Sequence, residues 1–152
     1  MDEVNDLIAK HYNATFEDSS SFSLPKDPEP MLRQFLFLLS SLMDRGLTLS
    51  AICLKDFKIS DHTLFLKKDT HITKLVEGHF FYRGDSACFS PGKSGKHSLA
   101  SLYHSVALFA YYLWTHKKVD KLSHFELEHL KGTKVYYFIR NAMEKHPILL
   151  YL

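Results

Sequence analysis

The amino-acid sequence predicts one mainly α-helical domain that carries small β-hairpins. Two long segments, 29–45 and 98–116, are apolar around most of a helical circumference, which is typical of buried helices. Between them lie short apolar segments separated by polar turns, a pattern typical of short strands. The length of 152 residues fits a single domain that buries its own core. We therefore expect residues 1–152 to form one domain, with its core over 28–150.

The N-terminal part, residues 1–27, is predicted to be a short helix over 2–13 followed by a polar, proline-containing connection. The first long helix then has clear boundary signals. Asp27 followed by Pro28 is typical of an N-cap residue and the first helical position. Gly46 stands where a residue in the left-handed conformation commonly ends a helix.

Three segments after the first long helix predict strands: 48–54, 63–66 and 71–76. The last two are separated by the four polar residues 67–70, so we expect them to pair as a hairpin. Residues 90–96, Ser-Pro-Gly-Lys-Ser-Gly-Lys, are typical of a loop.

The second long helix, 98–116, is followed by two shorter amphipathic segments. These predict helices over 123–131 and 133–145. Gly132 divides the two helices, and Pro147 stops the second one.

The charge of the chain is nearly balanced, because 19 Lys and Arg residues stand against 17 Asp and Glu residues, giving +2. This balance argues against a nucleic-acid partner, whose binding needs basic residues clustered on one face. The first residues lack the basic and apolar regions of a signal peptide. The longest apolar run, 35–39, is far shorter than the about 18–20 residues that a membrane span needs. We expect an intracellular protein, cytoplasmic or nuclear, with no membrane partner.

The two cysteines, Cys53 and Cys88, lie in apolar surroundings far apart in the sequence. We expect them to be buried free thiols in a reducing compartment, since a disulfide framework needs a denser set of cysteines. Neither has a His–carboxylate pair beside it that would indicate a nucleophile. The histidines of segment 124–129 do not match the spacing of a zinc motif, so we predict no metal site and no cofactor.

The order of helix, small strands, loop, buried helix and small helices resembles the large lobe of protein kinases. Residues 54–61, Leu-Lys-Asp-Phe-Lys-Ile-Ser-Asp, resemble a degraded catalytic loop of the His-Arg-Asp-Leu-Lys-Pro-Glu-Asn type. Residues 71–78 resemble the strand that leads into the Asp-Phe-Gly motif, and 89–92, Phe-Ser-Pro-Gly, resemble the Ala-Pro-Glu turn. Residues 101–115 are similar to the family's buried helix, and 138–147 to its late helix before an Asp-Pro turn.

The departures from the kinase pattern bear on activity. In this comparison, which covers about 28–150, Val76-Glu77-Gly78 stands in place of Asp-Phe-Gly, so no carboxylate occupies the metal-binding Asp position. Leu102 replaces the Asp that anchors the buried helix, and no Gly-rich loop precedes residue 28. The resemblance therefore implies a large lobe without the small lobe, as in a pseudokinase or the kinase non-catalytic C-lobe domain.

The resemblance also names vestigial catalytic candidates. Asp56 would be a surviving base, Lys58 its phosphate-directing lysine, and Asp61 a metal ligand in place of Asn. The alternative is that these three residues form a polar turn between strands.

A second candidate is a basic, glycine-containing segment ahead of the second long helix. Lys93, Ser94, Gly95 and Lys96 could present backbone N–H groups to an anion, although the spacing is not that of a P-loop. The alternative is a flexible basic loop.

We therefore expect a non-catalytic protein-interaction module, acting as a scaffold or adaptor, whose partner is a protein. One alternative is a phosphotransfer enzyme or nucleotide sensor that is completed by a small lobe in trans. Another is a helical adaptor unrelated to kinases.

Overall fold

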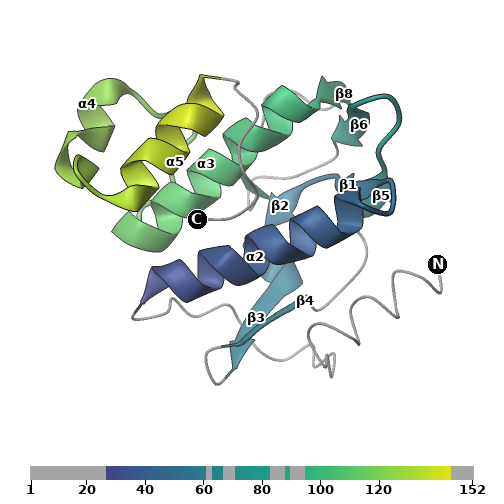
Figure 1. Cartoon of the computed structure of the whole chain (residues 1–152), viewed down its shortest axis with the longest axis horizontal. Helices are drawn as coiled ribbons and strands as arrows, with labels where there is room; N and C mark the ends of the chain where they lie inside the picture. Colours follow the sequence, from purple (N-terminus) through teal and green to yellow (C-terminus); the bar gives the residue numbers. More distant parts are fainter. Residues whose placement is uncertain (1–26, 61–62, 67–70, 83–87, 90–94, 145–152) are drawn as a thin grey trace.

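The computed structural model describes residues 27–60, 63–66, 71–82, 88–89 and 95–144. Two long helices cross a set of short strand pairs, and two shorter helical elements lie at one end (Figure 1). The predicted helix over 2–13, the four-residue loop 67–70 and most of the loop 90–96 lie outside the described residues.

Helix α2, Pro28–Met43, begins as its sequence predicts and ends two residues before the predicted end. The Asp27 carboxylate accepts a hydrogen bond from the Glu29 N–H at 3.2 Å, so Asp27 is the N-cap and Pro28 follows at the first helical position. After the helix, Gly46 adopts the left-handed conformation with φ of 71°. The N-terminal boundary signal is therefore confirmed, whereas the C-cap is Asp44 and Gly46 lies two positions after it.

Helix α3, Leu99–Thr115, is the second predicted long helix, and most of its residues are buried. Its first N–H group, from Leu99, donates to the carbonyl of Gly78 at 3.1 Å. The helix ends at His116, which has a left-handed φ of 62°. The start of α3 is thus attached to a turn that precedes it by some twenty positions in the sequence.

The C-terminal part consists of helix α4, His124–Leu127, a 3-10 turn at Glu128–Leu130, and helix α5, Lys134–Met143. Helix α5 packs along α3 (Figure 1). Gly132 separates the elements as predicted, and Thr133 caps α5 by accepting a hydrogen bond from the Tyr136 N–H at 3.2 Å.

The strands form four antiparallel pairs among the described residues. Strand β1 (Leu47–Leu49) pairs with β5 (Ile72–Lys74), and β2 (Ile52–Cys53) pairs with β7 (Cys88–Phe89). Strand β3 (Phe57–Ser60) pairs with β4 (Thr63–Leu66), and β6 (His79–Tyr82) pairs with β8 (Gly95–Ser98).

The predicted hairpin of 63–66 with 71–76 is wrong. Strand β4 pairs with β3 instead, with Phe57 opposite Leu66, and the two strands are separated by only two residues. Phe57, Leu64 and Leu66 are all buried, so this short hairpin places its apolar side chains in the core. The prediction of a loop over 90–96 is also wrong at its end, because Gly95 and Lys96 belong to β8.

Four phenylalanines form the centre of the core between the two long helices and the strands. Phe109 of α3 lies 4.7 Å from Phe35 of α2 and 5.5 Å from Phe89 of β7, measured between ring centroids. Phe57 of β3 contacts Phe35 at 5.8 Å. Aromatic pairs of this kind contribute about 0.5–1.5 kcal/mol each beyond the area they bury, so they join both helices to two strand pairs.

Within the described part of the chain, no helix combines the length and the apolar composition that crossing a membrane requires.

Candidate functional site

Asp56 is the vestigial catalytic candidate that the structure places in a defined polar site. It ends the 3-10 turn Leu54–Asp56 between β2 and β3, and only 4% of its surface is exposed. Its Oδ2 atom is hydrogen-bonded to Nδ1 of His71. Burial of a carboxylate is costly unless it is paired, and His71 supplies that pairing.

His71 is itself held in position by its backbone. Its carbonyl oxygen accepts hydrogen bonds from the Ser50 N–H at 2.6 Å and from the Ser50 hydroxyl at 3.2 Å. Because Ser50 follows β1 and His71 precedes β5, the pairing of those two strands carries the imidazole to Asp56. The sequence comparison did not single out His71, since its neighbourhood depends on this long-range pairing.

Of the other two catalytic candidates, only Lys58 lies in the described part of the chain. Lys58 is half-buried on β3, where it lies opposite Phe65 in the strand register. Asp61 lies outside the described residues. Leu102, which replaces the anchoring Asp of the kinase pattern, is buried in α3.

The two cysteines form a disulfide, so the expectation of free thiols is wrong. Cys53 of β2 and Cys88 of β7 lie directly opposite each other in the strand register. Their separation of 35 residues concealed this pairing, because the register of two distant strands cannot be read from either one alone.

The disulfide lies beside the Asp56–His71 pair. The Cys53 sulfur, an Asp56 carboxylate oxygen and a His71 ring nitrogen all lie within 4.8 Å of one another. Cys53 and Asp56 are buried and His71 is partly buried, so the described chain brings together sulfur, oxygen and nitrogen donors in one enclosed place.

The segment Val76–His79 forms a tight turn. Val76 and His79 exchange two backbone hydrogen bonds of 2.8 and 2.9 Å. The two residues between them, Glu77 and Gly78, have positive φ values of 51° and 75°, as a type I′ hairpin turn requires. The Val76 side chain is 61% exposed at this tip, so these residues build the connection between β5 and β6.

The β3–β4 hairpin changes the comparison with the kinase pattern. Residues 54–61 are not one loop, because 57–60 form a strand. The Asp-Phe-Gly position at 76–78 rests on the hairpin of 63–66 with 71–76, which the structure replaces. The segment that directly follows the observed hairpin is 67–70, and its sequence includes Asp69. Residues 76–78 therefore contain no Asp, whereas the sequence of the segment after the hairpin includes Asp69.

Of the four predicted anion-binding residues, two lie in the described part of the chain. Lys93 and Ser94 lie outside the described residues, while Gly95 and Lys96 form the start of β8. The Leu99 N–H at the start of α3 already donates to the Gly78 carbonyl.

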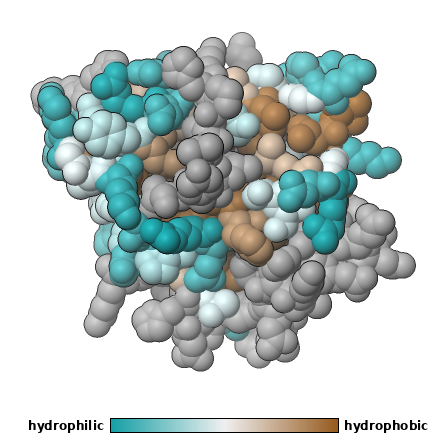
Figure 2. Space-filling model, in the orientation of Figure 1, coloured by the Kyte–Doolittle hydropathy of each residue, from teal (hydrophilic) through white to brown (hydrophobic). Residues whose placement is uncertain are grey.

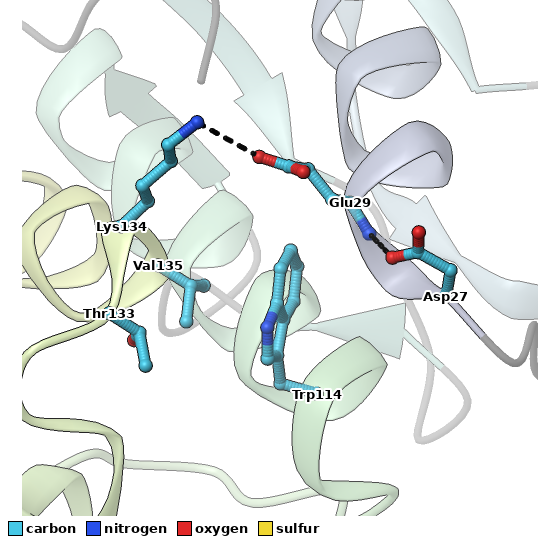
Figure 3. A pocket seen from close by; sticks show the side chains of 6 residues that line it. All are labelled: Asp27, Glu29, Trp114, Thr133, Lys134 and Val135. Carbon is cyan, nitrogen blue, oxygen red and sulfur yellow. Dashed lines mark hydrogen bonds and ion pairs between the residues drawn. The ribbon is translucent and has the colours of Figure 1, made fainter.

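A pocket of about 260 Å³ lies where the N-termini of α2 and α5 approach the C-terminal end of α3 (Figure 3). The Trp114 ring stands in its centre, between Glu29 on one side and Val135 on the other (Figure 3). Lys134 reaches across to Glu29, with 3.6 Å between Nζ and Oε1. Among the described residues of its wall, Asp27 and Glu29 are acids and Lys134 is a base.

Exposed apolar side chains also occur away from this pocket. Val76 and Phe81 belong to the β5–β6 hairpin, and Phe81 is 48% exposed. Figure 2 shows hydrophobic colour gathered at the upper right, where Figure 1 places β6 and β8.

Among the described residues, the environment shifts the pKa of Tyr103 and of Arg140. Burial raises the pKa of the Tyr103 phenol above its usual 10.0. Hydrogen bonds to Tyr136 and Glu144 raise the pKa of Arg140, which stays charged.

Comparison with known proteins supports the fold. No protein-family model matches the chain, and no curated protein matches it by sequence. A solved structure of similar fold is the Cydia pomonella granulovirus kinase PK-1, with a TM-score of 0.58 and 14% sequence identity. The match covers 90% of this chain but only 60% of that kinase. The chain therefore has a kinase-like fold.

Proposed function

We propose that this chain is a non-catalytic protein-interaction module built on a kinase-like fold. The proposal rests on the burial of Asp56 and on its hydrogen bond to His71. A catalytic base must reach the proton that it removes, but Asp56 is 4% exposed and its carboxylate is bonded to His71 inside the chain. In this proposal, Asp56 maintains the core of the site and does not act on a substrate.

The pocket around Trp114 is the binding site that we propose for the partner. Its volume of about 260 Å³ suits one long side chain. Glu29 is shared between Lys134 and Arg33, whose guanidinium lies 3.3 Å away. The Asp27 carboxylate and the cation–π surface of the indole ring favour a cationic group. We therefore propose that an arginine or lysine of a partner protein enters between Trp114 and Glu29. Trp and Arg are both enriched among residues that dominate binding energy at interfaces.

Nucleotide binding tests the non-catalytic part of the proposal. The purified chain is heated with Mg-ATP, with Mn-ATP and with ATP alone, and we expect the same melting temperature in all cases. A metal-dependent rise in melting temperature that disappears in Asp56→Asn would contradict the proposal. Asp120→Asn, an exposed carboxylate, is the matched control.

Trp114 fluorescence tests the binding pocket, because this is the chain's single tryptophan. A short capped peptide containing arginine is titrated against one in which citrulline, a neutral isostere, replaces arginine. We expect a saturable change in emission with arginine that is weaker with citrulline. Equal responses, or no response, would contradict a cation-binding pocket.

Substitutions then locate the contact. Glu29→Gln should weaken the response to arginine, and Lys134→Met should strengthen it, because Lys134 competes for Glu29 at 3.6 Å. Glu144→Gln is the control, because it removes an exposed carboxylate at the C-terminal end of α5.

The second candidate is a phosphotransfer enzyme that a small lobe completes in trans. It is favoured by Asp69, whose segment follows the β3–β4 hairpin, and by the kinase-like neighbour. A metal-dependent nucleotide shift that is lost in Asp69→Asn would support this candidate over the first.

A further inference from the structure

We propose that, once the Cys53–Cys88 disulfide is reduced, Cys53, Cys88, Asp56 and His71 bind one Zn²⁺ ion. This inference goes beyond the protein-interaction function and does not depend on it, since metal uptake is measured on the chain alone.

The four side chains come from four separate places in the fold. Cys53 ends β2, Asp56 ends the following 3-10 turn, His71 precedes β5, and Cys88 begins β7. The donor atoms of Cys53, Asp56 and His71 lie within 4.8 Å of one another, and the Cys88 sulfur is bonded to that of Cys53. Three donors therefore lie close together, and reduction leaves the Cys88 thiol next to that of Cys53, where it can supply the fourth ligand.

The donor types match zinc. Zn²⁺ in structural sites has four ligands, with Zn–S distances of about 2.3 Å and Zn–N and Zn–O distances of about 2.0–2.2 Å. Ligand atoms at the corners of such a tetrahedron are about 3.3–3.8 Å apart, which small side-chain rotations would produce here. Two thiolates with an imidazole favour zinc over magnesium or calcium, which prefer oxygen ligands.

The surroundings also suit a buried ion. Cys53 and Cys88 are almost completely buried, as is Asp56. The two hydrogen bonds from Ser50 hold the His71 backbone, which fixes the position of its imidazole before the ion arrives. In the oxidised chain the same four residues form two closed pairs, Cys53–Cys88 and Asp56–His71. The ion would replace both of these contacts at once.

The electrons and protons balance as follows. Two molecules of a monothiol reductant supply two electrons and two protons; their sulfurs join as a disulfide, and the protein disulfide becomes two thiols. When Zn²⁺ binds, the two thiol protons go to solvent and the ion keeps its charge. The disulfide and the zinc site are therefore alternative states, and a reducing compartment favours the zinc state.

Cobalt uptake by the reduced full-length chain tests the site. The chain is reduced, freed of metal and titrated anaerobically with Co²⁺, which gives visible absorption bands in tetrahedral sites and a near-ultraviolet band with thiolate ligands. We expect saturation at one equivalent, displacement of Co²⁺ by Zn²⁺, and no uptake by the oxidised chain. Because the thiols must lose their protons, affinity should fall as the pH is lowered.

Variants identify the ligands. Cys88→Ser leaves Cys53 as the one thiolate ligand, so it should weaken both the near-ultraviolet band and the binding. Asp56→Asn, which keeps the side-chain shape, should weaken binding by about tenfold or more. His79→Ala removes an exposed histidine and should bind as the unaltered chain does. Circular dichroism of each reduced variant establishes that it is folded. Failure of the folded, reduced chain to take up Co²⁺ would overturn the proposal, as would unchanged uptake by both Cys88→Ser and Asp56→Asn.

Discussion

At the scale of single residues, the buried polar side chains are held by specific partners. Asp56 is bonded to His71, and the Ser50 hydroxyl donates to the His71 carbonyl. Thr48 differs, because its fully buried hydroxyl has no hydrogen-bond partner among the described residues. An unsatisfied buried hydroxyl lowers stability, since water would otherwise solvate it.

Thr48→Val should therefore stabilise the chain or leave it unchanged. Valine keeps the branched shape and removes the unsatisfied oxygen, so we expect a gain of up to about 1 kcal/mol in the free energy of unfolding. Urea denaturation measures this gain. Thr73→Val, at the facing position of β5, is only partly buried and serves as the control. A clear loss of stability in Thr48→Val alone would show that the hydroxyl has a partner.

Tyr103 makes the free energy of unfolding depend on pH in the alkaline range. Burial raises the pKa of its phenol above 10.0, so the unfolded chain releases the proton at lower pH than the folded chain does. Its contribution to stability is complete below about pH 10 and is lost as the pH rises through the folded-state pKa. Tyr103→Phe should show a smaller loss of stability between about pH 9 and 11, measured by urea denaturation. Identical pH profiles would contradict the burial effect.

At the scale of elements, the turns determine which strands pair. The β5–β6 connection uses Glu77 and Gly78, both with positive φ. Glycine adopts this conformation freely, whereas a residue with a side chain pays about 1–2 kcal/mol for it. Asparagine tolerates the left-handed region better, and Asn-Gly is the preferred pair for a type I′ turn.

Glu77→Asn should accordingly raise the melting temperature. We expect a gain on the order of 1 kcal/mol in the free energy of unfolding, because only the backbone preference changes at this exposed position. Glu77→Ala keeps the unfavourable Cβ without the tolerance of asparagine, so it should give no such gain. Equal stabilisation by both variants would point to the loss of the Glu77 charge as the cause.

The elements also differ in how far the sequence could predict them. The helices follow from local signals, namely apolar periodicity, the Asp27 cap and Gly46. The partners of the other strands depend on distant contacts. The β3–β4 hairpin is local, and it was missed although only two residues separate its strands. The candidate site depends on two such pairings, β1 with β5 and β2 with β7. Asp56 was identified by its resemblance to a kinase residue, whereas its hydrogen-bond partner His71 was not.

At the scale of the whole molecule, the disulfide joins strand β2 covalently to strand β7. It closes a loop with a sequence separation of 35 residues. A loop of that size reduces the entropy of the unfolded chain, which stabilises the folded state by about 3–4 kcal/mol.

Reduction should therefore lower the stability of the metal-free chain. We expect the urea midpoint to fall when a phosphine reductant is added, by an amount equivalent to about 3–4 kcal/mol. The Cys53→Ser, Cys88→Ser double variant should not respond to the reductant. An unchanged midpoint for the unaltered chain would show that its two cysteines are not joined.

The four strand pairs share no strand with one another among the described residues. Each pair can consequently open without breaking the hydrogen bonds of another, so amide protons should exchange with solvent in groups. The amides of β6 and β8, at the exposed end of the molecule, would exchange through a local opening. Those of α2 and α3, whose side chains meet at Phe35 and Phe109, would exchange only when the whole chain unfolds.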